Sequence, residues 1–474
     1  MRSQLSLLRR ATYLSLGVLG IAATQWGCSD TTTAFAGGVR VDQLVRDIAV
    51  TVTDTTALIT WITPNPAPTR LEFGTTGSLG SRAGSNVEEA QHRVELTGLA
   101  PDTIYFYRVE GWGTSYRFRT MGGQRQRLAF VSDRGDGRRE VYLSYEWGEN
   151  VTRVTTGGGD QPSLSADGTR LAWVAPGPGG LLDVFSAQLD TAGLVPATTT
   201  NVTATADREE QNPDWSPDGA RLVFSAAGPG LPSQLVIRTV AGGAETVIMA
   251  QNGQHQEPDW RRDGSQIAFA STTRTATIQL SRRPVDPGSV TVVLNVGSKP
   301  TLAASEFELY DAAAGLVDLS GSTATDRDVL VSYTSGGQAV AEEGHHVPRA
   351  HLEIYAVNPD GSAVRRLTES GDRDVRTQPH WHPTQALLVL VYEAGAATNI
   401  GSIPAAGGSP TGITGGAVRD RNPVISPTGN LLLFSSDRHP DGLVNLYLSD
   451  FNGNVEELNL FSSGETQPDW SVVP

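Results

Sequence analysis

Short apolar runs recur along most of this chain, and each run is bounded by polar and turn-forming residues. Residues 222–225 (LVFS) and 431–435 (LLLFS) are typical examples. Runs of this length and composition are typical of β-strands that are buried on both faces. Most successive runs begin about 45 residues apart, as expected for repeated small sheets. The runs begin near Leu128, Leu171, Leu222, Ile267, Val329, Leu387 and Leu431.

A second pattern precedes these runs, in which a polar residue and a proline are followed two positions later by Trp, Leu or Ile. Its copies occupy residues 161–165, 212–216, 257–261, 378–382, 422–426 and 467–471. In the copy at 212–216, the turn Ser-Pro-Asp-Gly leads into the next apolar run, and Asp-Gly supplies the positive φ of a tight hairpin.

The last copy of this pattern has no apolar run after it, whereas the run at 127–132 has no copy before it. The C-terminal strand therefore supplies what the first repeat lacks. Small antiparallel sheets bury both of their faces when they close into a ring. The sequence predicts an all-β protein containing a β-propeller of seven blades, closed by the C-terminal strand.

Six blades is the alternative count, if residues 267–329 form one distorted blade with a long loop. No leading motif precedes Val329, and residues 307–310 and 316–319 compete for its place. The next blade carries a polar insertion at 336–350. Both irregularities are assigned to adjacent blades, the fourth and the fifth. Long loops on a rigid scaffold often carry binding sites, so this side of the ring is a candidate binding region.

The repeat also carries a family resemblance. The leading motif, the Ser-Asp-Arg turns at 132–134 and 436–438, and the strand Ile-Tyr-Ala-Val-Asn-Pro-Asp-Gly at 354–361 resemble the TolB-type, WD40-like (PD40) propeller repeat. The resemblance covers residues 124–474. Such propellers occur in periplasmic binding scaffolds, in the lid domains of prolyl peptidases and in a few lyases, so the resemblance implies a fold and leaves the function open.

Residues 43–120 show a different pattern, which predicts a β-sandwich. Residues 57–61 read as a strand, and residues 69–74 alternate as a half-buried strand does. The motif L-T-G-L-x-P-x-T-x-Y at 96–105 resembles a fibronectin type III domain, in the version that precedes the catalytic domain of purple acid phosphatases. After Thr120 the chain passes directly into the propeller repeats, without the G-N-H-[DE] loop of a metallophosphatase. Asp133 and Asp136 are interpreted as hairpin-turn residues.

The N-terminus predicts export and lipidation. Residues 1–27 have three early arginines and an apolar stretch at 11–23 that is too short to span a bilayer, which is the layout of a signal peptide. Cys28, the single cysteine, stands where a lipoprotein signal would place the new N-terminus. Residues 28–42 read as a tether. The expected location is the cell envelope, on the periplasmic side or the surface of the outer membrane, with simple secretion as the alternative.

The formal charge of −15 argues against nucleic acid as a partner, and an envelope protein or polysaccharide fits better. We interpret Asp214, Asp259 and Asp469, on the innermost strands, mainly as turn caps and hydrogen-bond partners of neighbouring strands. They could also make the channel mouth acidic. The candidate binding residues are Asp214, Asp259, His345, His346, His380, His382 and Asp469.

An enzymatic alternative rests on the histidines, because five of the eight lie between positions 345 and 382. His380 and His382 lie two apart on a predicted strand and are expected to point the same way. With Gln378 they resemble the divalent-metal site of some oligogalacturonate lyases, which implies a metal-dependent polysaccharide-active enzyme. No G-x-S-x-G elbow is present, and the cysteine belongs to the signal. The sequence therefore favours a non-enzymatic binding protein without a cofactor.

Overall fold

The computed structural model describes residues 45–474 apart from 192, 230–231, 250–253, 275–277, 295–300, 304–306, 313–315, 320–326, 347–349, 369–375, 440–441, 459–463 and 474. Strands make up almost all of its regular structure. Within these residues, no helix has both the length and the apolar character needed to cross a membrane. Cys28, the predicted signal peptide at 1–27 and the predicted tether at 28–42 lie outside the described residues.

The first described domain is a β-sandwich with one apolar core. Its strands are β1 (Arg46–Val52), β2 (Thr56–Gly74), β3 (Ser81–Thr97), β4 (Ile104–Val109) and β5 (Tyr116–Arg119). The strand order is β1-β2-β4-β5, and β3 also pairs with β2. Tyr105, in the motif that predicted this domain, accepts a hydrogen bond from the Ala100 N–H at 2.9 Å. This is the tyrosine corner typical of such sandwiches.

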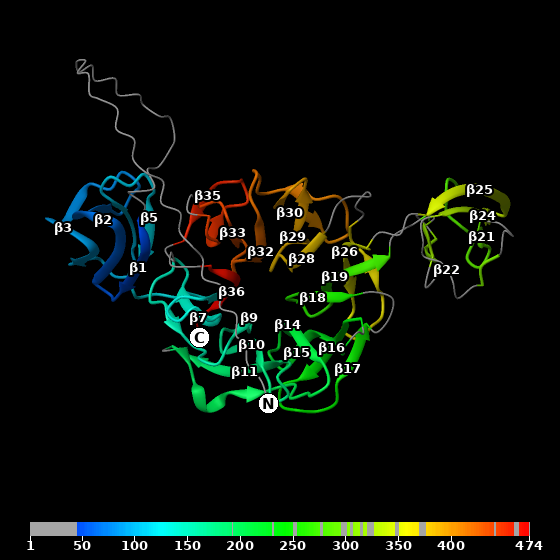
Figure 1. Cartoon of the computed structure of the whole chain (residues 1–474), viewed down its shortest axis with the longest axis horizontal. Helices are drawn as coiled ribbons and strands as arrows, with labels where there is room; N and C mark the ends of the chain where they lie inside the picture. The colour runs from blue at the N-terminus through cyan, green and yellow to red at the C-terminus, as the bar shows by residue number, and fades with distance from the viewer. Residues whose placement is uncertain are drawn as a thin grey trace, which may run out of the picture. The chain divides into compact units, whose positions relative to one another are not determined.

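The propeller consists of six antiparallel sheets of four or five strands, each arranged around an apolar second strand (Figure 1). Blade 1 contains β36 (Thr466–Val472), β6 (Gln126–Ser132), β7 (Glu140–Tyr145) and β8 (Thr152–Arg153). Blade 2 contains β9 (Asp160–Leu164), β10 (Arg170–Pro176), β11 (Leu182–Asp190), β12 (Gly193–Leu194) and β13 (Thr200–Asn201), with the short helix η2 (Pro196–Thr198). Blade 3 contains β14 (Glu209–Trp215), β15 (Arg221–Ala227), β16 (Gln234–Thr239) and β17 (Thr246–Met249).

The other three blades follow the same order from the innermost strand outward. Blade 4 contains β18 (His255–Trp260), β19 (Ile267–Arg274), β26 (Ala350–Val357) and β27 (Arg365–Arg366). Blade 5 contains β28 (Arg376–Trp381), β29 (Leu387–Ala394), β30 (Ala397–Pro404) and β31 (Thr411–Gly412). Blade 6 contains β32 (Asp420–Ile425), β33 (Leu432–Ser436), β34 (Asn445–Ser449) and β35 (Val455–Glu457).

The C-terminal strand closes the ring, as the sequence predicted. β36 pairs antiparallel with β6, so that Trp470 lies opposite Leu128 and Asp469 lies opposite Ala129. The innermost strands β36, β9, β14, β18, β28 and β32 contact one another in this order, and β32 in turn contacts β36. Each blade therefore packs both of its faces against neighbours, which is how a ring of small sheets becomes stable.

The blade count of seven is wrong, and the alternative count of six holds for the described residues. Val329 lies in β24, which pairs with β21 and β25 rather than with a blade. An apolar strand of the usual length was therefore mistaken for the second strand of a blade. The region is not a distorted blade either, because β19 and β26 pair regularly from Ile267 opposite Val357 to Arg274 opposite Ala350.

The residues between β19 and β26 form an insertion with its own small sheets and its own apolar core. Within residues 336–350, predicted to be a polar loop of the fifth blade, Gln338–His346 form strand β25 of this insertion, and Ala350 begins β26 of the fourth blade. Both irregularities of the repeat thus belong to one insertion. Its strands are β20 (Ile278–Gln279), β21 (Thr291–Leu294), β22 (Phe307–Asp311), β23 (Leu316–Leu319), β24 (Arg327–Ser335) and β25 (Gln338–His346). Its buried core includes Val292, Val317, Val329 and Val331.

Candidate functional site

The six innermost strands share a backbone kink that shapes the centre of the propeller. The residue before the proline has a φ between 50° and 55° in all six copies, namely Gln161, Asn212, Glu257, Gln378, Asn422 and Gln467. The pairing with the second strand of the blade shifts at the same place in all six. Each kink is a β-bulge, where proline is tolerated because it has no N–H to contribute to the ladder.

Positive φ is unfavourable for residues other than glycine, and here side-chain hydrogen bonds to the adjacent blade offset the strain. Gln161 Oε1 accepts the N–H of Asn212 at 2.6 Å, and Gln467 Oε1 accepts that of Gln161 at 3.1 Å. On the other side of the ring, Glu257 Oε2 accepts the N–H of Gln378 at 2.8 Å, and Gln378 Oε1 accepts that of Asn422 at 2.7 Å. These polar residues therefore join neighbouring blades.

In three of the innermost strands, an aspartate stands two positions after the residue with positive φ, and its carboxyl group joins two blades in the same way. Asp214 Oδ2 accepts the backbone N–H of Trp260 at 2.6 Å, and Asp259 Oδ2 accepts that of Trp381 at 2.6 Å. Asp469 Oδ2 accepts the N–H of Leu164. The prediction that these acids hydrogen-bond neighbouring strands is confirmed. The equivalent positions in the other three blades are Ser163, His380 and Val424.

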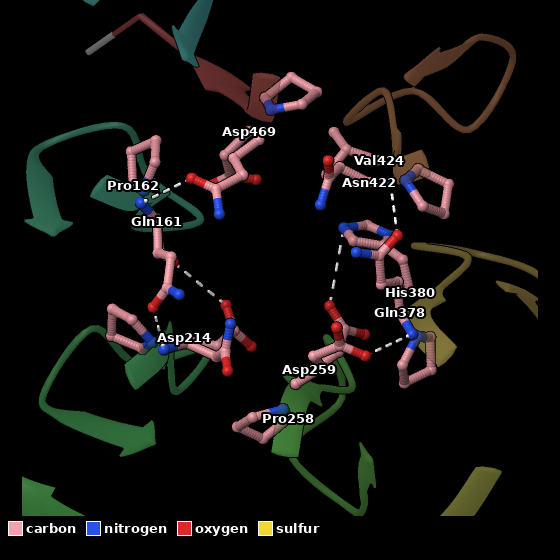
Figure 2. Close-up of a pocket in the computed structure, with 18 of the residues that line it drawn as sticks. Gln161, Pro162, Asp214, Pro258, Asp259, Gln378, His380, Asn422, Val424 and Asp469 are labelled. Carbon is pink, nitrogen blue, oxygen red and sulfur yellow. Dashed lines mark hydrogen bonds and ion pairs between the residues drawn. The ribbon is translucent and has the colours of Figure 1, made fainter. Parts of the chain in front are cut away.

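These layers line a central pocket of about 320 Å³ (Figure 2). A smaller hollow of about 90 Å³ adjoins it and is lined in part by the tryptophans that follow the acids. Asp214, Asp259, His380 and Asp469 line both spaces, so they form the constriction between them. We call these four residues the constriction ring. It contains three of the acids that the sequence singled out, together with one of its histidines.

Burial and mutual repulsion change the proton affinities in the constriction ring. Burial, together with the charge of Asp259, raises the pKa of Asp214 to about 8. Burial also raises the pKa of Asp469 to about 6, with a contribution from the Asp214 charge, and it raises the pKa of Asp259 well above its usual range. The pKa of His380 is lowered by burial. Water in the channel still reaches 14% of the Asp259 side chain and 23% of the His380 side chain, which moderates the desolvation.

Among the described histidine side chains, His380 and His382 lie in different environments. His380 lines the pocket, with Nε2 3.7 Å from Asp259 Oδ1. His382 lies beyond the end of β28 and acts as a turn residue, because its Nδ1 accepts the N–H groups of Thr384 and Gln385. The expectation that the two imidazoles point the same way is therefore wrong, since the strand alternation ends at Trp381.

The hydrogen bonds of His382 also determine its tautomer. Nδ1 accepts from two backbone N–H groups at 3.2 and 3.0 Å, so Nε2 carries the proton and donates it to the carbonyl oxygen of Gly429 at 2.9 Å. Neither nitrogen keeps a lone pair for a metal ion. In the described part of the chain, no group of three or more His, Cys, Asp or Glu side chains has the geometry of a metal site.

The remaining candidate histidines lie elsewhere in the fold. His345 and His346 lie in β25 of the insertion, and their backbones pair with Asp328 and Arg327. Their side chains, and that of His351, are outside the described part of the structure. Gln378, the third metal candidate, lines the pocket and joins blades 5 and 6.

Sequence reasoning missed the role of the residue before the proline in each copy of the motif. Gln161, Asn212, Glu257, Asn422 and Gln467 line the pocket, and none of them was a candidate. The sequence does contain a signal for this role. In all six copies, the residue before the proline is polar and has a side-chain carbonyl or carboxyl oxygen that can accept a hydrogen bond.

The fold and the pocket define a six-bladed β-propeller protein with an N-terminal β-sandwich. Residues 45–120 match the model of the purple acid phosphatase N-terminal domain. No curated protein matches the chain. Among solved structures, TolB from Acinetobacter baumannii is similar at 11% identity and a TM-score of 0.47, covering 93% of this chain and 89% of that one.

Two further solved structures are also similar to this chain. A putative TolB from Agrobacterium tumefaciens has 16% identity and a TM-score of 0.42, covering 74% of this chain and 98% of that one. An oligogalacturonate lyase in complex with manganese has 14% identity and a TM-score of 0.33, covering 71% of this chain and 86% of that one. At these identities the likeness concerns the fold and not the function.

Proposed function

We propose that this protein is a non-enzymatic binding scaffold of the cell envelope, and that its propeller binds a segment of a protein or an envelope polymer at the central pocket. The observation that supports this most is the chemistry of the pocket wall. Asp259 and Asp469 each use one carboxyl oxygen, Oδ2, to accept a backbone N–H of the adjacent blade. The second oxygen of Asp469 takes no part in this bond, whereas Asp259 Oδ1 lies 3.7 Å from His380 Nε2. Gln161 and Gln467 likewise join the blades through their side-chain oxygens.

Such a wall presents carboxyl oxygens and side-chain amides around an opening that is held rigid by the blades. It suits a polar or cationic chain rich in hydrogen-bond donors, because carboxylates form strong, charge-assisted hydrogen bonds. The metal-dependent alternative receives no support from His382, because both of its ring nitrogens are engaged in the turn.

The double substitution Asp259→Asn/Asp469→Asn should weaken ligand capture by the pocket at least about tenfold, because in each side chain an NH2 group, which cannot accept a hydrogen bond, replaces one carboxyl oxygen. An amide oxygen can still accept the N–H of the adjacent blade, so we expect the ring to remain folded. The measurement is quantitative mass spectrometry of envelope components cross-linked to purified residues 29–474.

The matched control is Asp218→Asn/Asp263→Asn, which makes the same chemical change on turns where the two side chains are 59% and 53% exposed. This control should capture the same components as the unmodified protein. Equal recovery by the pocket variant and by the control would contradict a binding role for the pocket.

We also propose that Cys28, which precedes the described residues, carries the lipid that holds the protein to a membrane. Cys28→Ser should move the protein from the membrane pellet to the supernatant after cell fractionation, because the modified thiol is lost. Ser29→Ala is the control and should remain in the pellet. An unchanged distribution of the Cys28→Ser protein would contradict lipid anchoring.

A further inference from the structure

The wall of the central pocket carries acids from three blades and no strong base (Figure 2). Asp214, Glu257, Asp259 and Asp469 line it, whereas no arginine or lysine is among the described residues that do so. His380 is the remaining titratable group of this wall, and burial lowers its pKa. Near neutral pH, the innermost strands therefore surround the pocket with groups that are either neutral or negative.

Arginines do occur just outside the pocket, and their positions indicate a direction of entry. Arg139 donates to Gln467 Oε1 at 3.1 Å, but its charge is already paired with Asp160 at 2.9 Å. Arg262 is exposed and lines the smaller hollow on the other side of the constriction ring. A cation entering from the larger pocket meets negative potential as far as the ring and a positive charge beyond it. The ring is thus the deepest favourable position for a positive group.

The constriction ring offers single acceptor atoms rather than pairs of them. Asp214 uses both carboxyl oxygens for hydrogen bonds to neighbouring strands. Asp259 and Asp469 each use Oδ2 to accept a backbone N–H of the adjacent blade, which leaves Oδ1 outside these bonds. Asp259 Oδ1 lies 3.7 Å from His380 Nε2, beyond hydrogen-bond distance. No carboxylate of the ring can therefore present both of its oxygens to one ligand group.

This arrangement of acceptors distinguishes between the two common cationic side chains. A guanidinium group is planar and pairs best with two parallel oxygens of one carboxylate. An ammonium group carries three diverging N–H donors, which suit single oxygens on different strands around an opening. The ring therefore fits an ammonium group better than a guanidinium group.

The shape of the site selects the molecule that carries the ammonium group. The ring lies at a narrowing between a pocket of about 320 Å³ and a hollow of about 90 Å³. A lysine ammonium stands at the end of a flexible four-carbon stem, so it can reach this point while the main chain stays in the wider pocket. The amine of an amino sugar is attached directly to the sugar ring, and the whole ring would have to enter the narrowing.

The wall of the wider pocket also suits a peptide main chain. Gln161 and Gln467 are partly exposed there, and their side-chain oxygens are engaged between blades. Their NH2 groups are donors, which can bind the carbonyl oxygens on either side of an inserted residue.

We propose, building on the function proposed for the pocket, that its ligand is a protein segment that inserts one lysine side chain from the wider side. The lysine ammonium lies in the constriction ring and donates hydrogen bonds to Asp259 Oδ1 and Asp469 Oδ1. The adjoining main chain lies against the side-chain amides of the wall.

Isothermal titration calorimetry at pH 7.5 tests this with purified residues 29–474 and the acetylated, amidated tripeptide Gly-Lys-Gly. We expect a Kd of about 0.1–1 mM, as fits a flexible ligand of this size. Norleucine in place of the lysine keeps the stem without the charge and should abolish measurable binding. Arginine in its place should weaken binding at least about fivefold. At pH 5 the lysine tripeptide should bind more weakly, because Asp469, with a pKa of about 6, is then mostly protonated.

One pair of variants locates the lysine. Asp469→Asn should weaken tripeptide binding at least about tenfold, and its amide oxygen can still accept the Leu164 N–H. Asp263→Asn makes the same change on a turn where the side chain is 53% exposed, and it should bind like the unmodified protein. Far-UV circular dichroism shows whether both variants are folded, and the three tripeptides decide on the unmodified protein if Asp469→Asn is not.

Several results would overturn the proposal. They are absence of lysine-tripeptide binding, equal binding of the norleucine tripeptide, tighter binding of the arginine tripeptide, and lysine-tripeptide binding unaffected by Asp469→Asn. Binding of glucosamine hexamer in place of the tripeptide would overturn the choice of a protein segment. The capture of envelope components by the Asp259→Asn/Asp469→Asn protein separates the two levels. If that capture is weakened, the pocket is a binding site with a different ligand, and if it is unchanged, the proposed function fails as well.

Discussion

Ending the chain after Gly464 is expected to unfold the propeller rather than trim it. The missing strand β36 pairs with β6 and supplies Trp470, which is buried in the core between blades 1 and 6. It also supplies Asp469 and Gln467, whose side chains hold the adjacent blade 2. Loss of this strand opens the ring and exposes two apolar blade faces to solvent at once, and the five intact blades cannot bury these faces. Far-UV circular dichroism and urea unfolding measure the effect.

A single substitution isolates the apolar part of this closure. Trp470→Ala should lower the free energy of unfolding by about 3–5 kcal/mol, because a large buried ring is replaced by a cavity. Trp470→Phe fills much of the same space and should cost less than about 2 kcal/mol. A truncated chain that unfolds in one cooperative transition at the unmodified midpoint would show that β36 does not close the ring.

The ring closure was predictable from the sequence because it depends on a local motif that is repeated many times. A leading motif without a follower at 467–471 and a follower without a leader at 127–132 can be found without knowing any contact. The sandwich was predictable for a similar reason, since its motif L-T-G-L-x-P-x-T-x-Y at 96–105 ends in Tyr105, which accepts a local hydrogen bond from the Ala100 N–H.

The blade count failed because apolar content alone does not distinguish a blade strand from a strand of another small sheet. Val329 and Val331 are fully buried in the core of the insertion, just as Val223 is fully buried in blade 3. The leading motif is more informative than the apolar run, because it encodes the β-bulge that lines the channel. It occurs six times, once for each blade.

The sequence could predict only those residues of the candidate site whose position is determined by the repeated motif alone. Asp214, Asp259, His380 and Asp469 occupy the same position in different copies of the motif, so a closed ring brings them together. His382 lies one residue past the strand end, where turn hydrogen bonds rather than strand alternation determine its direction.

The constriction ring should make the propeller more stable in mild acid than in mild base. The pKa of Asp214 is raised to about 8 in the folded protein, whereas an aspartate in the unfolded chain titrates near 4. Between these values the folded state binds more protons than the unfolded state, so the free energy of unfolding decreases as the pH rises. One such group contributes a slope of up to about 1.4 kcal/mol per pH unit. Asp469, with a pKa of about 6, adds to the slope mainly below pH 6.

Asp214→Asn should therefore flatten the decline in the free energy of unfolding between pH 6 and 8 by about 1 kcal/mol per pH unit, a value reduced from the maximum because water partly reaches the ring. The replacement amide can keep the local bonds: its oxygen can accept the Trp260 N–H, and its NH2 can donate to Ser163 Oγ, which is now bonded to Asp214 Oδ1 at 3.2 Å. Urea unfolding at several pH values provides the measurement.

Asp218→Asn is the matched control for this substitution. Asp218 is an exposed turn residue whose pKa is lowered by a hydrogen bond from the Ser216 hydroxyl, so it is already ionised above pH 6 in both the folded and the unfolded chain. Its replacement should leave the slope between pH 6 and 8 unchanged. Parallel stability curves for Asp214→Asn and the unmodified protein would mean that Asp214 is ionised throughout this range. The constriction would then carry a fixed negative charge at neutral pH, and a ligand would have to neutralise that charge to bind there.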